Sequence, residues 1–195
     1  MILVSSRLIN THWLLGDLEK AAETSERFVK QNPDNLYAHI LKGHTLSYLD
    51  PEGAIAAYGK ALEHATTKTE RGDVLVSRSN ALLIAGKIEK ALADAEEASQ
   101  IDSKDYVAAI NMSIALKRMG RKEDAYRIVK ETLPIIKDSP YNRACAYAVL
   151  EEKEKMLEEL EAAIKSDKIY KVNAKYDPDF ADFREDPDFC KLLSK

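Results

Sequence analysis

Cysteine is scarce in this 195-residue chain, which has only Cys145 and Cys190, far apart in the sequence. This count excludes a disulfide framework, and the two residues lack the short paired spacing of a zinc site or a redox motif. The N-terminus also lacks a long hydrophobic run. Its four apolar residues 1–4 are followed at once by polar ones. Such a run is too short for a signal peptide or a membrane span. We therefore expect a cytoplasmic protein that does not enter a membrane.

Motifs for catalysis and cofactor binding are also missing. None of the seven glycines forms the GxGxxG or GxxxxGK pattern of a phosphate-binding loop. The four histidines, His12, His39, His44 and His64, accompany no nucleophile motif. His39 and His44 are five residues apart, so they do not share a helix face as a metal site requires. We expect no catalytic residues, no cofactor and no metal ion.

No strong charge of either sign is present. Lys and Arg number 29 against 33 Asp and Glu, a net charge of -4, so the long-range field does not favour nucleic acid. Hydrophobic residues make up 45% of the chain, which is ordinary for a folded protein and too high for a wholly disordered one. The length is sufficient for a sizeable hydrophobic core.

An internal repeat is the strongest pattern in the sequence. The segments 16–22, 86–92 and 120–126 each have a glycine, then polar residues, then an alanine that opens an amphipathic run. The alanines Ala21, Ala54, Ala91 and Ala125 recur at intervals of 33, 37 and 34 residues, and Met156 takes the same place in a fifth copy. This interval is typical of a helix-turn-helix repeat.

Each part of the repeat has a physical role. Glycine adopts the left-handed conformation that ends one helix, and the alanine lets the next helix pack closely against it. Segments 31–35 and 101–105 interrupt the helical pattern with proline or small polar residues. Each repeat is therefore predicted to be a pair of antiparallel helices.

These residues resemble the tetratricopeptide repeat family over nearly the whole chain. The resemblance implies an all-α fold, a right-handed superhelical α-solenoid of antiparallel helix pairs. We place repeats at 2–35, 36–71, 72–105, 106–136 and 137–170, within an array spanning 1–170. Four repeats have a small residue at position 8: Gly43, Ser79, Ser113 and Ala144. Three departures from the pattern are Ile9 at that position, Pro134 three residues early, and Glu151 in place of the turn glycine.

The C-terminal segment 171–195 resembles the capping end of such arrays. Two Asp-Pro-Asp-Phe sequences begin at Asp177 and Asp186, and each Asp-Pro is predicted to start a short helix. We expect the segment to cover an open apolar end with Phe180, Phe183, Phe189, Leu192 and Leu193. A catalytic carboxylate cluster is the less favoured interpretation.

No comparable cap precedes the first repeat, where several apolar residues occur. Two interpretations stay open: self-association into a homo-oligomer through this N-terminal end, or local packing together with charged side chains. The apolar residues concerned are Ile2, Leu3, Leu8, Ile9, Trp13 and Leu14.

The family resemblance implies that the first helix of each repeat lines a concave groove that binds a protein or peptide. Tyrosines there supply rigid contact area, asparagines bond a peptide backbone, and Lys117 with Arg118 meets an acidic group. The alternative for Ile110 and Ile114 is packing against neighbouring helices. Whether the partner is an extended peptide or a helix stays open. The predicted groove residues are Tyr37, Ile40, His44, Asn80, Ile110, Asn111, Ile114, Lys117 and Tyr141.

Chaperone-binding members of the family hold a peptide carboxylate with a clamp of Lys, Asn and Arg residues. Here Asn111 stands at a clamp position, but Asp73 and Ser77 precede it, and Asp138 and Asn142 follow it. The predicted function is thus a non-catalytic scaffold or adaptor that does not use the clamp. The alternative is an RNA-binding helical-repeat protein, which the acidic balance disfavours.

Overall fold

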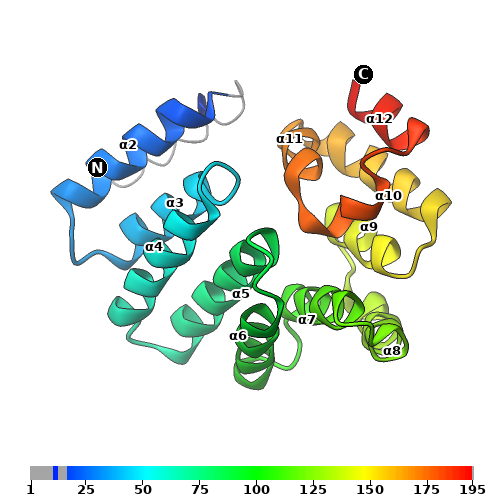
Figure 1. Ribbon diagram of the computed structural model, residues 1–195, viewed down its shortest axis with the longest axis horizontal. Helices are drawn as coiled ribbons and strands as arrows, with labels where there is room; N and C mark the ends of the chain where they lie inside the picture. Colours follow the sequence, from blue (N-terminus) through cyan, green and yellow to red (C-terminus); the bar gives the residue numbers. More distant parts are fainter. Residues whose placement is uncertain (1–10, 13–16, 195) are drawn as a thin grey trace. The chain divides into compact units, whose positions relative to one another are not determined.

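The computed structural model describes residues 11–12 and 17–194, and these residues form helices and no strand. The all-helical prediction is therefore confirmed for this part of the chain (Figure 1). The helices are α2 (Leu18–Gln31), α3 (Leu36–Leu46), α4 (Pro51–His64), α5 (Lys68–Ile84), α6 (Ile88–Ile101), α7 (Tyr106–Arg118), α8 (Lys122–Thr132), α9 (Pro140–Val149), α10 (Lys153–Ser166), α11 (Ile169–Tyr176) and α12 (Pro187–Ser194), with 3₁₀ helices η1 (Leu133–Ile135) and η2 (Pro178–Phe183).

The chain divides into two compact halves, Met1–Ser103 and Lys104–Lys195. In the N-terminal half α3 pairs with α4 and α5 with α6, while α2 packs on α3 and α4 on α5. In the C-terminal half α7 pairs with α8 and α9 with α10, and α11, η2 and α12 follow. The helices of each pair are antiparallel (Figure 1). The predicted repeat boundaries, and the division between an array at 1–170 and a cap at 171–195, stay predictions.

The apolar residues considered for self-association at the N-terminal end lie outside the described residues, as does Gly16. The homo-oligomer therefore stays a prediction. Among the described residues, no helix is both long and apolar enough to cross a membrane.

Local sequence accounts for where the helices begin. Side chains of Asp17, Asn35 and Asp50 accept hydrogen bonds from backbone N–H groups in the first turns of α2, α3 and α4. Thr67 and Glu70 form a reciprocal capping box at the start of α5. These caps satisfy N–H groups that have no partner inside the helix.

Three turns between paired helices contain a residue with positive φ. Gly86 and Gly120 have φ of 72° and 80°, and Glu151 has φ of 61°. The turn therefore keeps its left-handed conformation where glutamate replaces glycine, at a cost of roughly 1 kcal/mol. The Glu151 carboxylate contacts Lys122 at 2.8 Å and Lys117 at 3.3 Å. The hydrogen bond from Lys122 is the main cause that lowers the pKa of Glu151 to about 2.

Small residues bring the two helices of a pair into close contact. Ser79 and Ala91 are both fully buried, and the Ser79 hydroxyl donates to the Ala91 carbonyl oxygen at 2.8 Å. At the equivalent place in α3, a Cβ on Gly43 would lie 2.5 Å from the buried Tyr58 ring of α4. The four alanine marks predicted from the sequence are all fully buried, and Ala91 lies at a close contact between α5 and α6.

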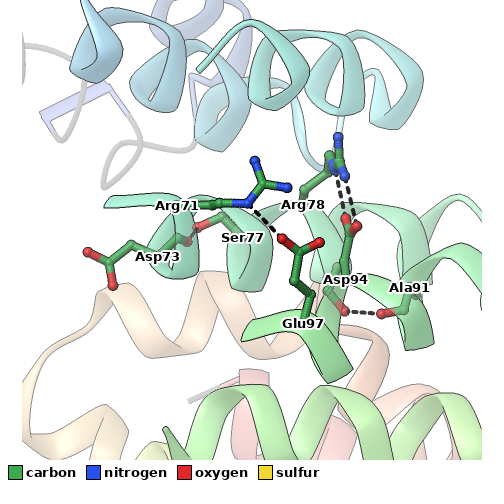
Figure 2. A network of polar contacts seen from close by, with 8 residues as sticks. Arg71, Asp73, Ser77, Arg78, Ala91, Asp94 and Glu97 are labelled. Carbon is green, nitrogen blue, oxygen red and sulfur yellow. Dashed lines mark hydrogen bonds and ion pairs between the residues drawn. The ribbon is translucent and has the colours of Figure 1, made fainter. Parts of the chain in front are cut away.

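Two arginine–carboxylate pairs join α5 to α6 (Figure 2). Arg78 Nε and Nη2 donate to the two carboxylate oxygens of Asp94 at 2.6 and 2.7 Å, and Asp94 is buried. Arg71 donates to Glu97 at 2.6 Å, but both of these side chains are more than 40% exposed. Each ion pair joins a residue of α5 to a residue of α6. Of the four side chains, only that of Asp94 is largely shielded from water.

A second bidentate pair has the same sequence separation in the C-terminal half. Arg143 of α9 donates to both carboxylate oxygens of Glu159 in α10, at 2.7 and 2.9 Å. Arg78 and Asp94 are 16 residues apart, as are Arg143 and Glu159. The repeat therefore reproduces a side-chain contact as well as a backbone arrangement.

The two Asp-Pro sequences start helices as predicted. Asp177 accepts a hydrogen bond from the backbone of Asp179 before η2, and Asp186 accepts from Asp188 and Phe189 before α12. Phe180 and Phe189 are buried with ring centroids 5.7 Å apart.

Replacement of Gly43 by alanine is expected to destabilise the protein. The new methyl group meets the Tyr58 ring, and overpacking of about 1–3 kcal/mol outweighs the helix-propensity gain of about 0.5–1 kcal/mol. Gly59→Ala in α4 is the matched control, because in the described part of the chain nothing beyond its neighbouring residues and its own helix backbone lies within 4 Å of a Cβ there. Urea unfolding of the two variants should show opposite shifts from the unmodified chain. Equal stability of the two variants would contradict the close contact at Gly43.

Loss of Asp94 is expected to cost more stability than loss of Glu97. Asp94→Ala leaves the half-buried Arg78 without its bidentate partner, a cost of about 1–3 kcal/mol. Glu97→Ala removes an exposed pair on the same two helices and is expected to cost less than about 1 kcal/mol. Denaturant unfolding of both variants measures the difference. A larger loss for Glu97→Ala would show that Arg78–Asp94 is not the stabilising pair.

Candidate functional site

The predicted groove residues lie on α3, α5, α7 and α9, the first helices of the pairs. Their exposure differs between the two halves of the chain. In the N-terminal half Tyr37 is 55% exposed, His44 is exposed, and Ile40 and Asn80 are partly exposed. In the C-terminal half, Lys117 is partly exposed. The remaining predicted residues there are buried: Ile110, Asn111, Ile114 and Tyr141.

In the N-terminal half, α3 and α5 contact each other and carry mixed side chains. Tyr37 and His44 of α3 and Asn80 of α5 offer an aromatic surface with hydrogen-bonding groups. Ile40 packs partly against a buried cluster that includes Leu36 and Tyr58, so it also stabilises the helix pair. Asp73 of α5 is exposed and points away from the Arg78–Asp94 pair (Figure 2). These side chains combine aromatic rings with groups that donate and accept hydrogen bonds.

In the C-terminal half, the chain's own segment η2 lies on α7 and α9. Lys117 pairs with Asp182 at 2.9 Å, and Arg118 donates to the Pro178 carbonyl oxygen at 3.2 Å. On α9 the Tyr141 hydroxyl donates to Asp177 at 2.7 Å. Residues predicted to bind a partner are thus occupied by the C-terminal segment.

Aromatic side chains hold the same segment against α9. The Tyr141 ring makes an edge-to-face contact with Phe180, with centroids 5.8 Å apart, and stacks on Tyr170 of α11 at 4.8 Å. Phe180 is fully buried. These contacts explain why Tyr141 is only 8% exposed, whereas the sequence predicts an open binding residue.

A cavity of about 250 Å³ remains between η2 and the two helices. Its walls are apolar and charged, and Lys117 lies at its edge beside acidic residues of η2. The lining residues are Ile114, Lys117, Arg118, Val149, Pro178, Asp179, Ala181 and Asp182.

Three side chains that can ligate a metal come together beside this cavity. One ligand atom from each of Cys145, Asp177 and Asp179 lies within 4.8 Å of the other two. Burial is the main cause that raises the pKa of the Asp179 carboxyl well above its usual value, and the neighbouring Asp177 adds to the effect. Burial also raises the pKa of the Cys145 thiol.

Sequence reasoning missed both this cluster and the position of η2. Cys145 lies on α9 and the two aspartates follow α11, so no short motif joins them. The Asp-Pro pattern predicts a helix start but does not specify which surface the helix covers.

Sequence and structure comparisons agree with this fold. Residues 82–146 match the sequence model of the tetratricopeptide repeat family. No curated protein sequence matches the chain.

Three solved structures illustrate the likeness. A thermophilic TPR protein of Thermus thermophilus is 18% identical with a TM-score of 0.64, covering 90% of this chain and 97% of that one. The pilF protein of Pseudomonas aeruginosa is 15% identical with a TM-score of 0.60, and the match covers 98% of this chain and 88% of that one. YrrB, described as a TPR protein with an unusual peptide-binding site, is 22% identical with a TM-score of 0.51. The match covers 87% of this chain and 89% of that one.

At these identities the structural likeness concerns the fold alone. Residues 82–146 match the tetratricopeptide repeat model, and the chain has the paired-helix fold of tetratricopeptide repeat proteins.

Proposed function

We propose that this chain is a non-catalytic, cytoplasmic adaptor that binds a segment of another protein on the α3 and α5 surface. The observation that carries the proposal is the contrast in exposure between the two halves. Tyr37 is 55% exposed on α3, whereas Tyr141 on α9 is covered and 8% exposed. Tetratricopeptide repeats generally serve as protein-interaction scaffolds, and YrrB is described as having a peptide-binding site.

The α3 and α5 surface suits a peptide for specific chemical reasons. Tyr37 offers a rigid ring that loses little conformational entropy on binding, with a hydroxyl for a hydrogen bond. The Asn80 amide both donates and accepts, which matches the N–H and C=O groups of a peptide backbone. His44 lies on the same helix as Tyr37 and contacts the Tyr58 ring edge-on at 5.8 Å, which restrains its orientation.

The α7 and α9 surface is not proposed as the main binding face. A partner there would have to replace the Lys117–Asp182 ion pair and the Tyr141–Asp177 hydrogen bond. It would also have to remove the fully buried Phe180. Exposing such a side chain to water costs about 1.5–3 kcal/mol, before any partner contact is gained.

Peptide selection followed by mutation tests the proposal. Peptides are selected from a random display library on the immobilised full chain, and their affinities are measured by fluorescence polarisation. The combined variant Tyr37→Ala, His44→Ala and Asn80→Ala is expected to weaken binding at least about tenfold, because aromatic anchors dominate binding energy.

The matched control is the double variant Lys60→Ala and Glu63→Ala. These exposed residues of α4 pair with each other at 2.9 Å and lie on a second helix. The control is expected to bind with unchanged affinity. Undiminished binding by the triple variant, or an equal loss in the control, would refute the α3 and α5 assignment.

A further inference from the structure

The cluster of Cys145, Asp177 and Asp179 has the dimensions of a small metal site. Each residue contributes one ligand atom, and these three atoms lie within 4.8 Å of one another. Zinc binds thiolate sulfur at about 2.3 Å and carboxylate oxygen at about 2.0–2.2 Å, which places tetrahedral ligand atoms roughly 3.5 Å apart. A small inward movement of the three side chains is enough to reach that spacing.

An unsatisfied oxygen atom provides independent support for a ligand. Asp179 Oδ1 is buried and has no hydrogen-bond partner among the described residues, although the Asp179 carboxyl lies beside Cys145 and Asp177. A buried polar atom without a partner costs about 1–3 kcal/mol, and such atoms in a folded protein call for a specific explanation. A cation between Asp179 and Cys145 would give this oxygen a partner.

The surroundings orient the neighbouring carboxylate. Asp177 accepts hydrogen bonds from the Tyr141 hydroxyl at 2.7 Å and from the Asp179 backbone at 3.1 Å. Each carboxylate oxygen keeps a further lone pair for a metal. Hydrogen bonds of this kind fix the position of ligating carboxylates in metal sites.

Charge balance also favours a divalent ion. Arg118 donates to the carbonyl oxygen of Pro178, between the two aspartates, and acts electrostatically on both. Once Cys145 and Asp179 are deprotonated by metal binding, the thiolate and two carboxylates carry three negative charges, which Arg118 and one divalent cation neutralise. Buried charges require compensation of this kind.

We propose that Cys145, Asp177 and Asp179 bind a zinc ion, with water from the adjoining cavity as the fourth ligand. Binding replaces the Cys145 S–H bond with a sulfur–zinc bond and the O–H bond of the protonated Asp179 carboxyl with an oxygen–zinc bond, and both protons pass to solvent. The thiolate favours zinc over magnesium or calcium, which prefer ligation by oxygen alone. Because Cys145 lies on α9, Asp177 caps η2 and Asp179 lies within it, the ion fastens η2 to α9.

Cobalt titration of the full chain tests the site. After dialysis against a chelator, Co²⁺ is added and the thiolate-to-cobalt charge-transfer absorbance is followed in the near ultraviolet. The unmodified chain is expected to develop this band and to lose it on addition of Zn²⁺. Cys190→Ser is the matched control, because Cys190 is the other cysteine, is exposed and lies outside the cluster.

Two variants make the result decisive. Cys145→Ser is expected to abolish the band while Cys190→Ser retains it. Asp179→Asn keeps the thiol and is expected to weaken cobalt affinity at least about tenfold. Circular dichroism checks the fold of each variant, and if Cys145→Ser is unfolded then Asp179→Asn decides the question. The proposal is overturned by no band in the unmodified chain, by a band that survives Cys145→Ser, or by unchanged affinity in Asp179→Asn.

Discussion

Close approach of two helices at residues with small side chains is the constraint on which the rest of the structure depends. Ser79 and Ala91 meet with a hydrogen bond from the side chain of one helix to the backbone of the other. Helices brought this close can also be joined by side chains farther along, as Arg78 and Asp94 are. Arg143 and Glu159 are also 16 residues apart and form the same kind of ion pair. The helix pair therefore brings these two positions together, and the pair forms where the sequence places an arginine and a carboxylate there.

Features that depend on local sequence were predictable. Glycine and alanine marks predicted the turns and the paired helices, since both residues act through their own backbone freedom or lack of bulk. Glu151 shows the limit of such reasoning, because it departs from the glycine pattern yet adopts the same positive φ. Its ion pairs with Lys117 and Lys122 come from two preceding segments of the chain, and no pattern within the turn itself indicates them.

Features that depend on distant contacts were not predictable. The Asp-Pro sequences predicted where η2 and α12 begin, but the surface that η2 covers depends on Tyr141, Lys117 and Arg118. The predicted groove residues are exposed or partly exposed in the N-terminal half, whereas all but Lys117 are buried in the C-terminal half. The position of a residue within the repeat does not indicate whether its side chain is exposed or buried, since the predicted groove residues of both halves lie on first helices.

The C-terminal segment contacts the α7 and α9 helices and also contributes two aspartates to the cluster with Cys145. A helical array needs its last apolar surface covered, and the burial of Phe180 and Phe189 is consistent with the predicted cap. The segment that carries them also places Asp177 and Asp179 beside Cys145, which leaves a buried oxygen without a partner. The same segment therefore contacts Lys117, Arg118 and Tyr141 on α7 and α9, and it completes the cluster for which we propose a zinc ion. The first helices of the N-terminal half keep exposed side chains such as Tyr37, and the proposal of a partner site on α3 and α5 rests on this difference.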